Sequence, residues 1–142
     1  MPITLTVPED VLDRETEAKV FAQLTDTLLD IEGLRDNAFM VPNVVGTLHT
    51  LPRNRIFSGG AAALAAFVEL KLPAVALASS DSKRRFIERA TQIVARASGG
   101  QIPPERVWVN VVYAADGAWG IAGQAYDNAA LGDAIGAAAI AR

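Results

Sequence analysis

Hydrophobic and polar positions alternate over residues 3–7, which predicts a strand with one buried face. Apolar residues then recur at every third or fourth position, which predicts a helix with one buried face. This set comprises Val20, Leu24, Leu28 and Ile31. Asp13 is expected to cap the start of the helix and Gly33 to end it. A β-rich stretch follows over residues 44–51, so the pattern predicts strand, helix and strand.

The same order recurs in the second half of the chain, with strands expected at residues 67–72 and 107–113. Between them, a helix is predicted with its N-cap at Ser79, Ser80 or Asp81 and its end at Gly99-Gly100. Its buried face is predicted to comprise Phe86, Ala90, Ile93 and Ala97, widened by Ile87 and Val94.

Matching landmarks in the two halves indicate an internal repeat. Val7-Pro8 and Leu72-Pro73 each close a first strand, and Gly33 and Gly99 each follow a helix. We therefore predict an α+β fold, in which two tandem β-α-β units form a four-stranded mixed sheet with two helices on one face. The strands within each unit should be parallel, because a helix connects them. Two helices cannot cover both faces of a sheet, so we expect self-association.

The 142 residues are expected to form a single domain. Residues 1–60 would hold the first unit, residues 61–126 the second unit with a carboxy-terminal hairpin, and residues 127–142 a tail. Asp116-Gly117 is a tight-turn signal within that hairpin. The tail is rich in alanine and is expected to form a short helix.

The amino-acid composition excludes several classes of active site and binding partner. The chain has no cysteine and one histidine, His49, so neither thiolate chemistry nor a histidine metal cluster within one chain is possible. The net charge of −3 offers no basic field for nucleic acid. No apolar stretch is long enough to cross a bilayer, and no secretory signal is visible. A soluble cytoplasmic protein without metal or organic cofactor is expected.

Pro2 stands directly before the first predicted strand. Removal of Met1 would leave a terminal proline whose nitrogen is a secondary amine. An α-amino group has a pKa near 8, and burial in an apolar pocket lowers this value. Such an amine could take or give a proton near neutral pH.

Pro2, the β-α-β unit and the late segment Asp-Gly-Ala-Trp-Gly-Ile-Ala-Gly-Gln at residues 116–124 together resemble the tautomerase superfamily. The segment is similar to the carboxy-terminal hairpin of 4-oxalocrotonate tautomerase. The doubled length resembles the fused members, malonate semialdehyde decarboxylase and cis-3-chloroacrylic acid dehalogenase. Residues 55–60 and 107–109 resemble two segments of the dehalogenase. The resemblance implies a homotrimer, with Pro2 as general base and Trp119 as a wall of its pocket.

The chain departs from these relatives at their charged residues. Trp108 stands where the tautomerase has a substrate-binding arginine, and residues 76–82 lack the arginine pair of the fused members. Ala118 falls near the dehalogenase's water-activating glutamate. The resemblance therefore gives poor support to decarboxylation or dehalogenation of small acids, and it favours a less charged carbonyl substrate.

Four further residues are candidates for substrate binding. Trp108 and Asn110 are two positions apart and share one face of a strand. Asn110 would hydrogen-bond a carbonyl or be a satisfied buried amide, and Arg53 and Arg55 would replace the missing arginines or be solvated loop charges. The leading function is keto–enol tautomerisation of a small carbonyl compound with Pro2 as base. The alternatives are a hydratase or decarboxylase with Pro2 as acid, and a non-catalytic trimeric protein.

Overall fold

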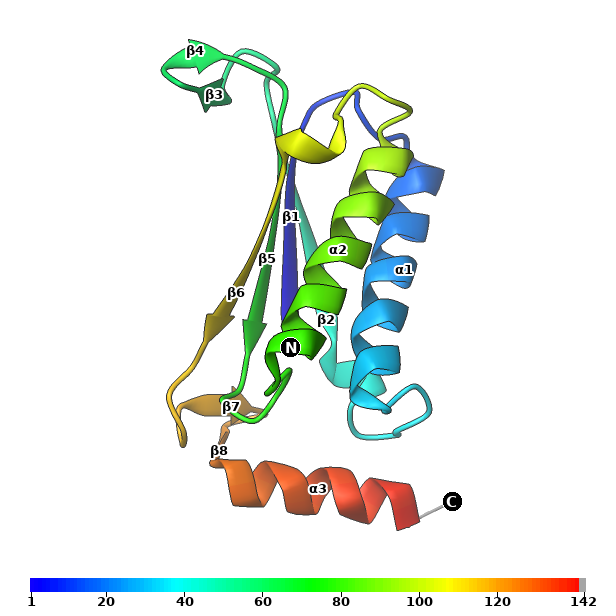
Figure 1. The fold of residues 1–142 in the computed structure, drawn as a ribbon. Coiled ribbons are helices and arrows are strands. Elements are labelled where there is room, and N and C mark those ends of the chain that lie inside the picture. The colour runs from blue at the N-terminus through cyan, green and yellow to red at the C-terminus, as the bar shows by residue number, and fades with distance from the viewer. Residues whose placement is uncertain (141–142) are drawn as a thin grey trace.

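The computed structural model describes residues 1–140, in which one mixed four-stranded sheet carries two long helices on one face (Figure 1). The strands lie in the order β2-β1-β5-β6. β1 and β2 are parallel, β5 and β6 are parallel, and β1 and β5 are antiparallel. The predicted fold class is therefore correct. The elements are β1 (Pro2–Pro8), α1 (Arg14–Glu32), β2 (Val45–Leu51), β5 (Ala66–Leu72), α2 (Ser80–Ala97) and β6 (Val107–Tyr113).

Smaller elements lie at both ends of the sheet. A hairpin of β3 and β4 projects at one end, and a hairpin of β7 and β8 leads to the helix α3 at the other (Figure 1). The sequence pattern did not predict the first hairpin, although it did predict the second hairpin and the tail helix. The bounds are η1 (Val41–Asn43), β3 (Phe57–Ser58), β4 (Ala61–Ala62), η2 (Pro104–Arg106), β7 (Trp119–Ile121), β8 (Gln124–Tyr126) and α3 (Asn128–Ile140).

The ends of α1 are the ones that its sequence predicts. The Asp13 carboxylate accepts a hydrogen bond from the Thr16 N–H at 2.7 Å, which satisfies one of the free donors of the first turn. Gly33 follows the last turn with φ at 69°, a left-handed conformation in which a side chain is strained. α1 therefore begins and ends at local signals.

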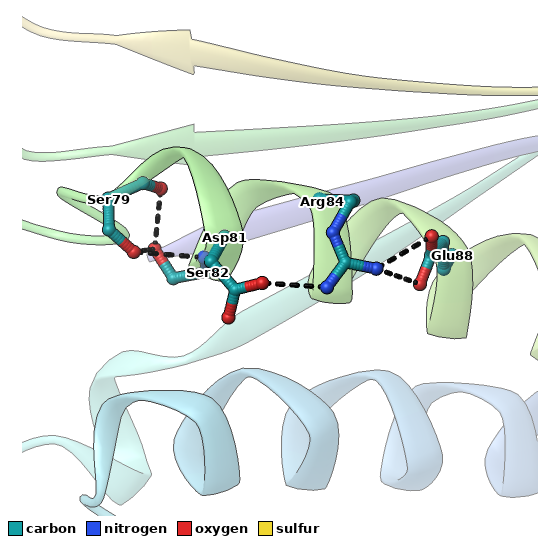
Figure 2. A network of polar contacts seen from close by, with 5 residues as sticks. All are labelled: Ser79, Asp81, Ser82, Arg84 and Glu88. Carbon is teal, nitrogen blue, oxygen red and sulfur yellow. Dashed lines mark hydrogen bonds and ion pairs between the residues drawn. The ribbon is translucent and has the colours of Figure 1, made fainter.

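A polar network stabilises the start of α2 (Figure 2). Ser79 is the N-cap, and its Oγ accepts from the Ser82 N–H at 3.0 Å. One turn later, the Arg84 guanidinium donates to Asp81 at 2.6 Å and to Glu88 at 2.9 Å. Ser82 is half-buried and the other side chains are exposed, so the network contributes more to the local geometry than to the stability of the fold.

The core lies between the two helices and the face of the sheet that they cover. Ile3, Leu5 and Val7 alternate into it from β1, and Phe86 is fully buried on α2. The prediction for α2 was wrong at Ile87, which is 38% exposed, because its position falls outside the apolar stripe of the helix.

The opposite face of the sheet is not covered by any described element of the chain (Figure 1). Side chains alternate across a strand, so the residues between the buried positions point to this open face. Three of its large apolar side chains are strongly exposed: Val45 at 50%, Trp108 at 42% and Val112 at 43%. We call this surface the open face.

α3 lies across the end of the sheet at which β1 begins (Figure 1). The Asn37 amide donates to the Ile135 carbonyl at 2.9 Å, and Leu131 is buried. The last described helix is thus joined to the loop that follows α1. Within residues 1–140, no helix combines the length and the apolar character needed to cross a membrane.

Candidate functional site

The amino terminus of the chain lies in a pocket of about 340 Å³ at the start of β1. Pro2 and Trp119 both line this pocket. No side chain among the lining residues is ionisable, and the amine of Met1 is the pocket's titratable group. The lining comprises Met1, Pro2, Asn43, Val45, Ala114, Ala118, Trp119, Gly120 and Ile121.

The amine of Met1 is held inside the protein and not in bulk water. It donates a hydrogen bond to the Asn43 carbonyl, and burial lowers its pKa from 8.0 to about 6. Desolvation is the cause, because a low dielectric disfavours the charged form of an amine. An amine with this pKa is largely neutral at pH 7 and can accept a proton.

Asn43 is a residue of this site that sequence reasoning missed. Its amide donates to the Phe39 carbonyl at 2.7 Å, which fixes the short helix η1. Its own backbone carbonyl then faces the terminal amine. A backbone acceptor has no side-chain signature, so the Pro42-Asn43 turn signal was the only available hint.

Trp119 reaches the pocket from β7 and is half-buried. Its hairpin is fixed at two points. The Asp116 carboxylate accepts from the Asn128 N–H at 2.6 Å, and the rings of Phe39 and Tyr126 lie 6.0 Å apart. The hairpin is therefore attached both to α3 and to the loop after α1, which positions Trp119 opposite Pro2.

A second polar cluster lies beside this end of the sheet. Glu32, at the end of α1, accepts from the Leu77 N–H at 2.8 Å, and burial raises the pKa of its carboxyl group. The Tyr113 hydroxyl donates to the Ala76 and Leu77 carbonyls at 2.8 and 3.0 Å. Tyr113 directly precedes Ala114 of the pocket, so these contacts position one wall of the site.

Trp108 and Asn110 do share a strand face, as predicted, but they lie on the open face and not in the pocket of their own chain. The Trp108 ring is stacked on Phe67, with ring centres 5.8 Å apart. Asn110 pairs in register with Glu69 and is exposed. Within one chain, neither residue is brought to Pro2.

Arg53 and Arg55 lie at the far end of the sheet from Pro2. Arg53 follows Leu51, which pairs with Pro8 at the opposite end of β1. Its guanidinium donates to the Glu9 carbonyl and to Gln101, both at 3.4 Å. Neither arginine can therefore reach the Pro2 pocket of its own chain.

The segment between β5 and α2, residues 73–79, brings no cation to the pocket. The first arginine after it is Arg84, whose guanidinium is already engaged with Asp81 and Glu88 (Figure 2). Lys83 instead lies over the Tyr113 ring, 5.5 Å from its centre. Among residues 1–140, the lining of the site is apolar with one amine, and it contains no Lys or Arg side chain.

Two larger depressions lie elsewhere, and neither contains the amino terminus or Trp119. One of about 490 Å³ lies between α1 and α2, and one of about 400 Å³ lies beside α3. Both contain Arg35, which is paired with Asp30 on the surface at 3.2 Å. Among residues 1–140, no group of three or more His, Cys, Asp or Glu side chains is arranged to hold a metal.

Comparison with known proteins shows the fold. No protein-family model matches the chain, and no curated protein is detectably similar in sequence. Among solved structures, native fused 4-OT is 22% identical with a TM-score of 0.76, over 93% of this chain and 99% of that one. An F6 fused 4-OT, described as an asymmetric trimer, is 21% identical with a TM-score of 0.76, over 93% and 99%. N1, a member of the cis-3-chloroacrylic acid dehalogenase family, is 20% identical with a TM-score of 0.74, over 89% and 83%. The chain therefore has the fold of the fused 4-OT structures, with two β-α-β units in one chain.

Proposed function

We propose that this chain is a tautomerase-superfamily enzyme, in which Pro2 becomes the amino terminus and acts as general base for keto–enol tautomerisation. The observation that carries the proposal is the apolar pocket around the amino terminus, where burial lowers the pKa of the present amine to about 6. A general base works best when its pKa lies near the working pH. A proline nitrogen at this position would be neutral and rigidly held by β1.

The proposed reaction needs only proton transfers. The Pro2 nitrogen takes a proton from the carbon beside the carbonyl group, which leaves an enolate. The protonated Pro2 then gives this proton to the enolate oxygen, which yields the enol and restores the neutral amine. Trp119 and the small residues of its hairpin exclude water, so each dipole in the pocket acts through a low dielectric. Since no Lys or Arg among the described residues 1–140 lines the pocket, a neutral carbonyl compound suits it better than a dicarboxylate.

The proposal includes a cytoplasmic homotrimer without cofactor, assembled through the open face. The exposed Val45, Trp108 and Val112 provide an apolar surface that a second copy would cover. Trp108, Asn110, Arg53 and Arg55 remain proposed substrate-binding residues. Because none of them lines the pocket of its own chain, they would have to act from a neighbouring subunit.

The general-acid alternative is less well supported. A hydratase or decarboxylase would need a protonated Pro2 at neutral pH, whereas the environment of the terminus favours the neutral amine. A non-catalytic trimer is the remaining alternative, and it predicts that the Pro2 amine contributes nothing to the rate of enol ketonisation.

The test is a titration of the Pro2 nitrogen by NMR, combined with an assay of the ketonisation of phenylpyruvate enol. Mass spectrometry first establishes that Pro2 is the terminal residue. We expect a proline pKa well below that of a free peptide. Pro2→Ala replaces the rigid secondary amine by a more mobile primary amine, so it should reduce the rate at least about tenfold. An amine that titrates as in free peptides, with no proline-dependent rate, would support the non-catalytic trimer.

A further inference from the structure

Met1 occupies an unusual position for the first residue of a chain. Terminal residues are commonly frayed, yet the Met1 side chain is only 4% exposed and belongs to the hydrophobic core. The same residue lines the pocket that contains Pro2 and Trp119. Met1 therefore fills space that extends from the pocket into the core.

β1 is held in the sheet mainly by residues after Met1. The strand pairs with β2 over Pro2–Pro8 and with β5 over residues 3–6. Met1 contributes its amine contact to Asn43, its buried side chain, and a 3.3 Å bond from the Val45 N–H to its carbonyl at the Pro2–Val45 pair. Removal of Met1 would therefore keep the pairing from Ile3 onward and open the space of its side chain beside the new terminal nitrogen.

The surroundings of that space are apolar. The buried cluster that contains Met1 also contains Val44, which directly precedes the Pro2–Val45 pair. Leu72 belongs to it as well, and it ends β5 at the same end of the sheet, since Leu70 pairs with Ile3. A ligand group that enters this space would therefore meet hydrocarbon at Val44 and Leu72.

We propose that the space of the Met1 side chain becomes a binding subsite for an unbranched apolar arm of the substrate. The inference rests on the proposed function and narrows its substrate class. The substrate would be a neutral carbonyl compound whose alkyl arm is about as long as a methionine side chain. Its carbonyl group would lie between the Pro2 nitrogen and Trp119, with the arm directed toward Val44. A chain that keeps Met1 would fill its own subsite.

The test compares two forms of the protein. Ordinary expression with excision supplies the chain that begins at Pro2, and cleavage of a fusion partner before Met1 supplies the chain that keeps it. Methyl ketones with alkyl arms from ethyl to heptyl are titrated into each form, and binding is followed on the NMR signal of the Trp119 indole N–H. This readout does not depend on catalysis.

For the chain that begins at Pro2, affinity should rise about fourfold per added methylene, as burial of each CH₂ implies. The rise should stop once the arm exceeds the length of the methionine side chain. The chain that keeps Met1 should show no rise. The same length dependence in both forms, or in neither, would overturn the inference.

Val44→Met, made in the chain that begins at Pro2, provides a second test. The longer side chain would enter the vacated space from the position just before β2 and shift the preferred ketone to a shorter arm. An unchanged preference would count against the subsite.

Ketonisation of phenylpyruvate enol is measured separately, so the two proposals can fail independently. Length-dependent binding without a proline-dependent rate would reject the catalytic proposal and retain the subsite. A proline-dependent rate without length-dependent binding would retain the catalytic proposal and reject the subsite.

Discussion

One carboxylate oxygen of Glu32 accepts a hydrogen bond from the backbone N–H of Leu77 at 2.8 Å. The contact joins the end of α1 to the loop between β5 and α2, across the two units. Leu77 has a positive φ of 43°, which is strained for a leucine, and its side chain is fully buried. Burial of that side chain and the Glu32 contact together hold the strained turn.

Removal of the Glu32 acceptor should destabilise the fold. We expect Glu32→Ala to lower the free energy of unfolding by about 1–3 kcal/mol, because the Leu77 N–H loses its partner.

Glu32→Gln keeps an acceptor and removes a half-buried charge. Since burial raises the pKa of Glu32, the folded state holds the proton longer than the unfolded state, and wild-type stability should fall as pH rises above 4.5 through the raised value. Urea unfolding from pH 4 to 8 should show this fall in the wild type and not in Glu32→Gln.

In the chain that keeps Met1, the terminal amine should make the free energy of unfolding rise with pH, which is opposite to the effect of Glu32. Its folded pKa of about 6 lies below the ordinary 8.0, so between these values the unfolded state binds more protons and stability rises with pH. After allowance for solvent screening, we expect the gain to be on the order of 1–2 kcal/mol. Urea unfolding between pH 5.5 and 8.5 measures it. An N-formylated chain, which has no such amine, is the control, and an equal slope there would contradict the assignment.

Gly46 is needed for the packing of Phe21 on the sheet. A Cβ at this position would lie 2.6 Å from Cε1 of the Phe21 ring, closer than real contacts allow. We expect Gly46→Ala to cost about 1–3 kcal/mol of unfolding free energy, as overpacking does. Gly132→Ala is the matched control, because its Cβ meets nothing within 4 Å inside a helix. That change should be neutral or slightly stabilising in the same denaturation experiment.

The open face should control self-association. Trp108→Glu places a charge on the apolar surface that the proposed trimer buries, and burial of an unpaired charge is costly. We expect analytical ultracentrifugation to show a shift from trimer toward monomer. Ile87→Glu is the control, since this residue is similarly exposed but lies on the helix side of the molecule. If both variants assemble like the wild type, the open face is not the interface.

Trp119 should affect the chemistry more than the stability. Trp119→Ala admits water to the pocket, so we expect kcat/KM for enol ketonisation to fall at least about tenfold, near 1.4 kcal/mol. The pKa of Pro2 should rise toward that of a free peptide. Trp119→Phe keeps an apolar wall and should retain most of the rate. An alanine variant with wild-type kcat/KM and an unchanged Pro2 pKa would remove Trp119 from the site.

The fold could be predicted where local signals decide it. Asp13 and Gly33 define α1, because capping and a positive φ depend on neighbouring residues alone. The β3–β4 hairpin was missed because its strands have two residues each, too few to show a period. Ile87 was placed wrongly because a helical pattern gives the direction of a buried face and not its width.

The site could be predicted only in part. Pro2 and Trp119 lie in one pocket because β1 begins at the end of the sheet where β6 ends. Asn43 accepts the hydrogen bond of the terminal amine through its backbone carbonyl. Every residue type has such a carbonyl, so the sequence could not indicate this contact. The roles proposed for Trp108, Asn110, Arg53 and Arg55 depend on surfaces of a second copy, and a single chain does not contain them.

If Pro2 is the proposed general base, the burial of Met1 limits the time in which Met1 can be removed during biosynthesis. An aminopeptidase needs an accessible terminus, and the folded chain offers it a methionine that is 4% exposed. β1 acquires its second neighbour only when β5, ending at Leu72, has left the ribosome. At about 5–20 residues per second, this leaves several seconds for excision. A mutation that speeds early folding would then give a stable protein in which the proposed general base stays blocked.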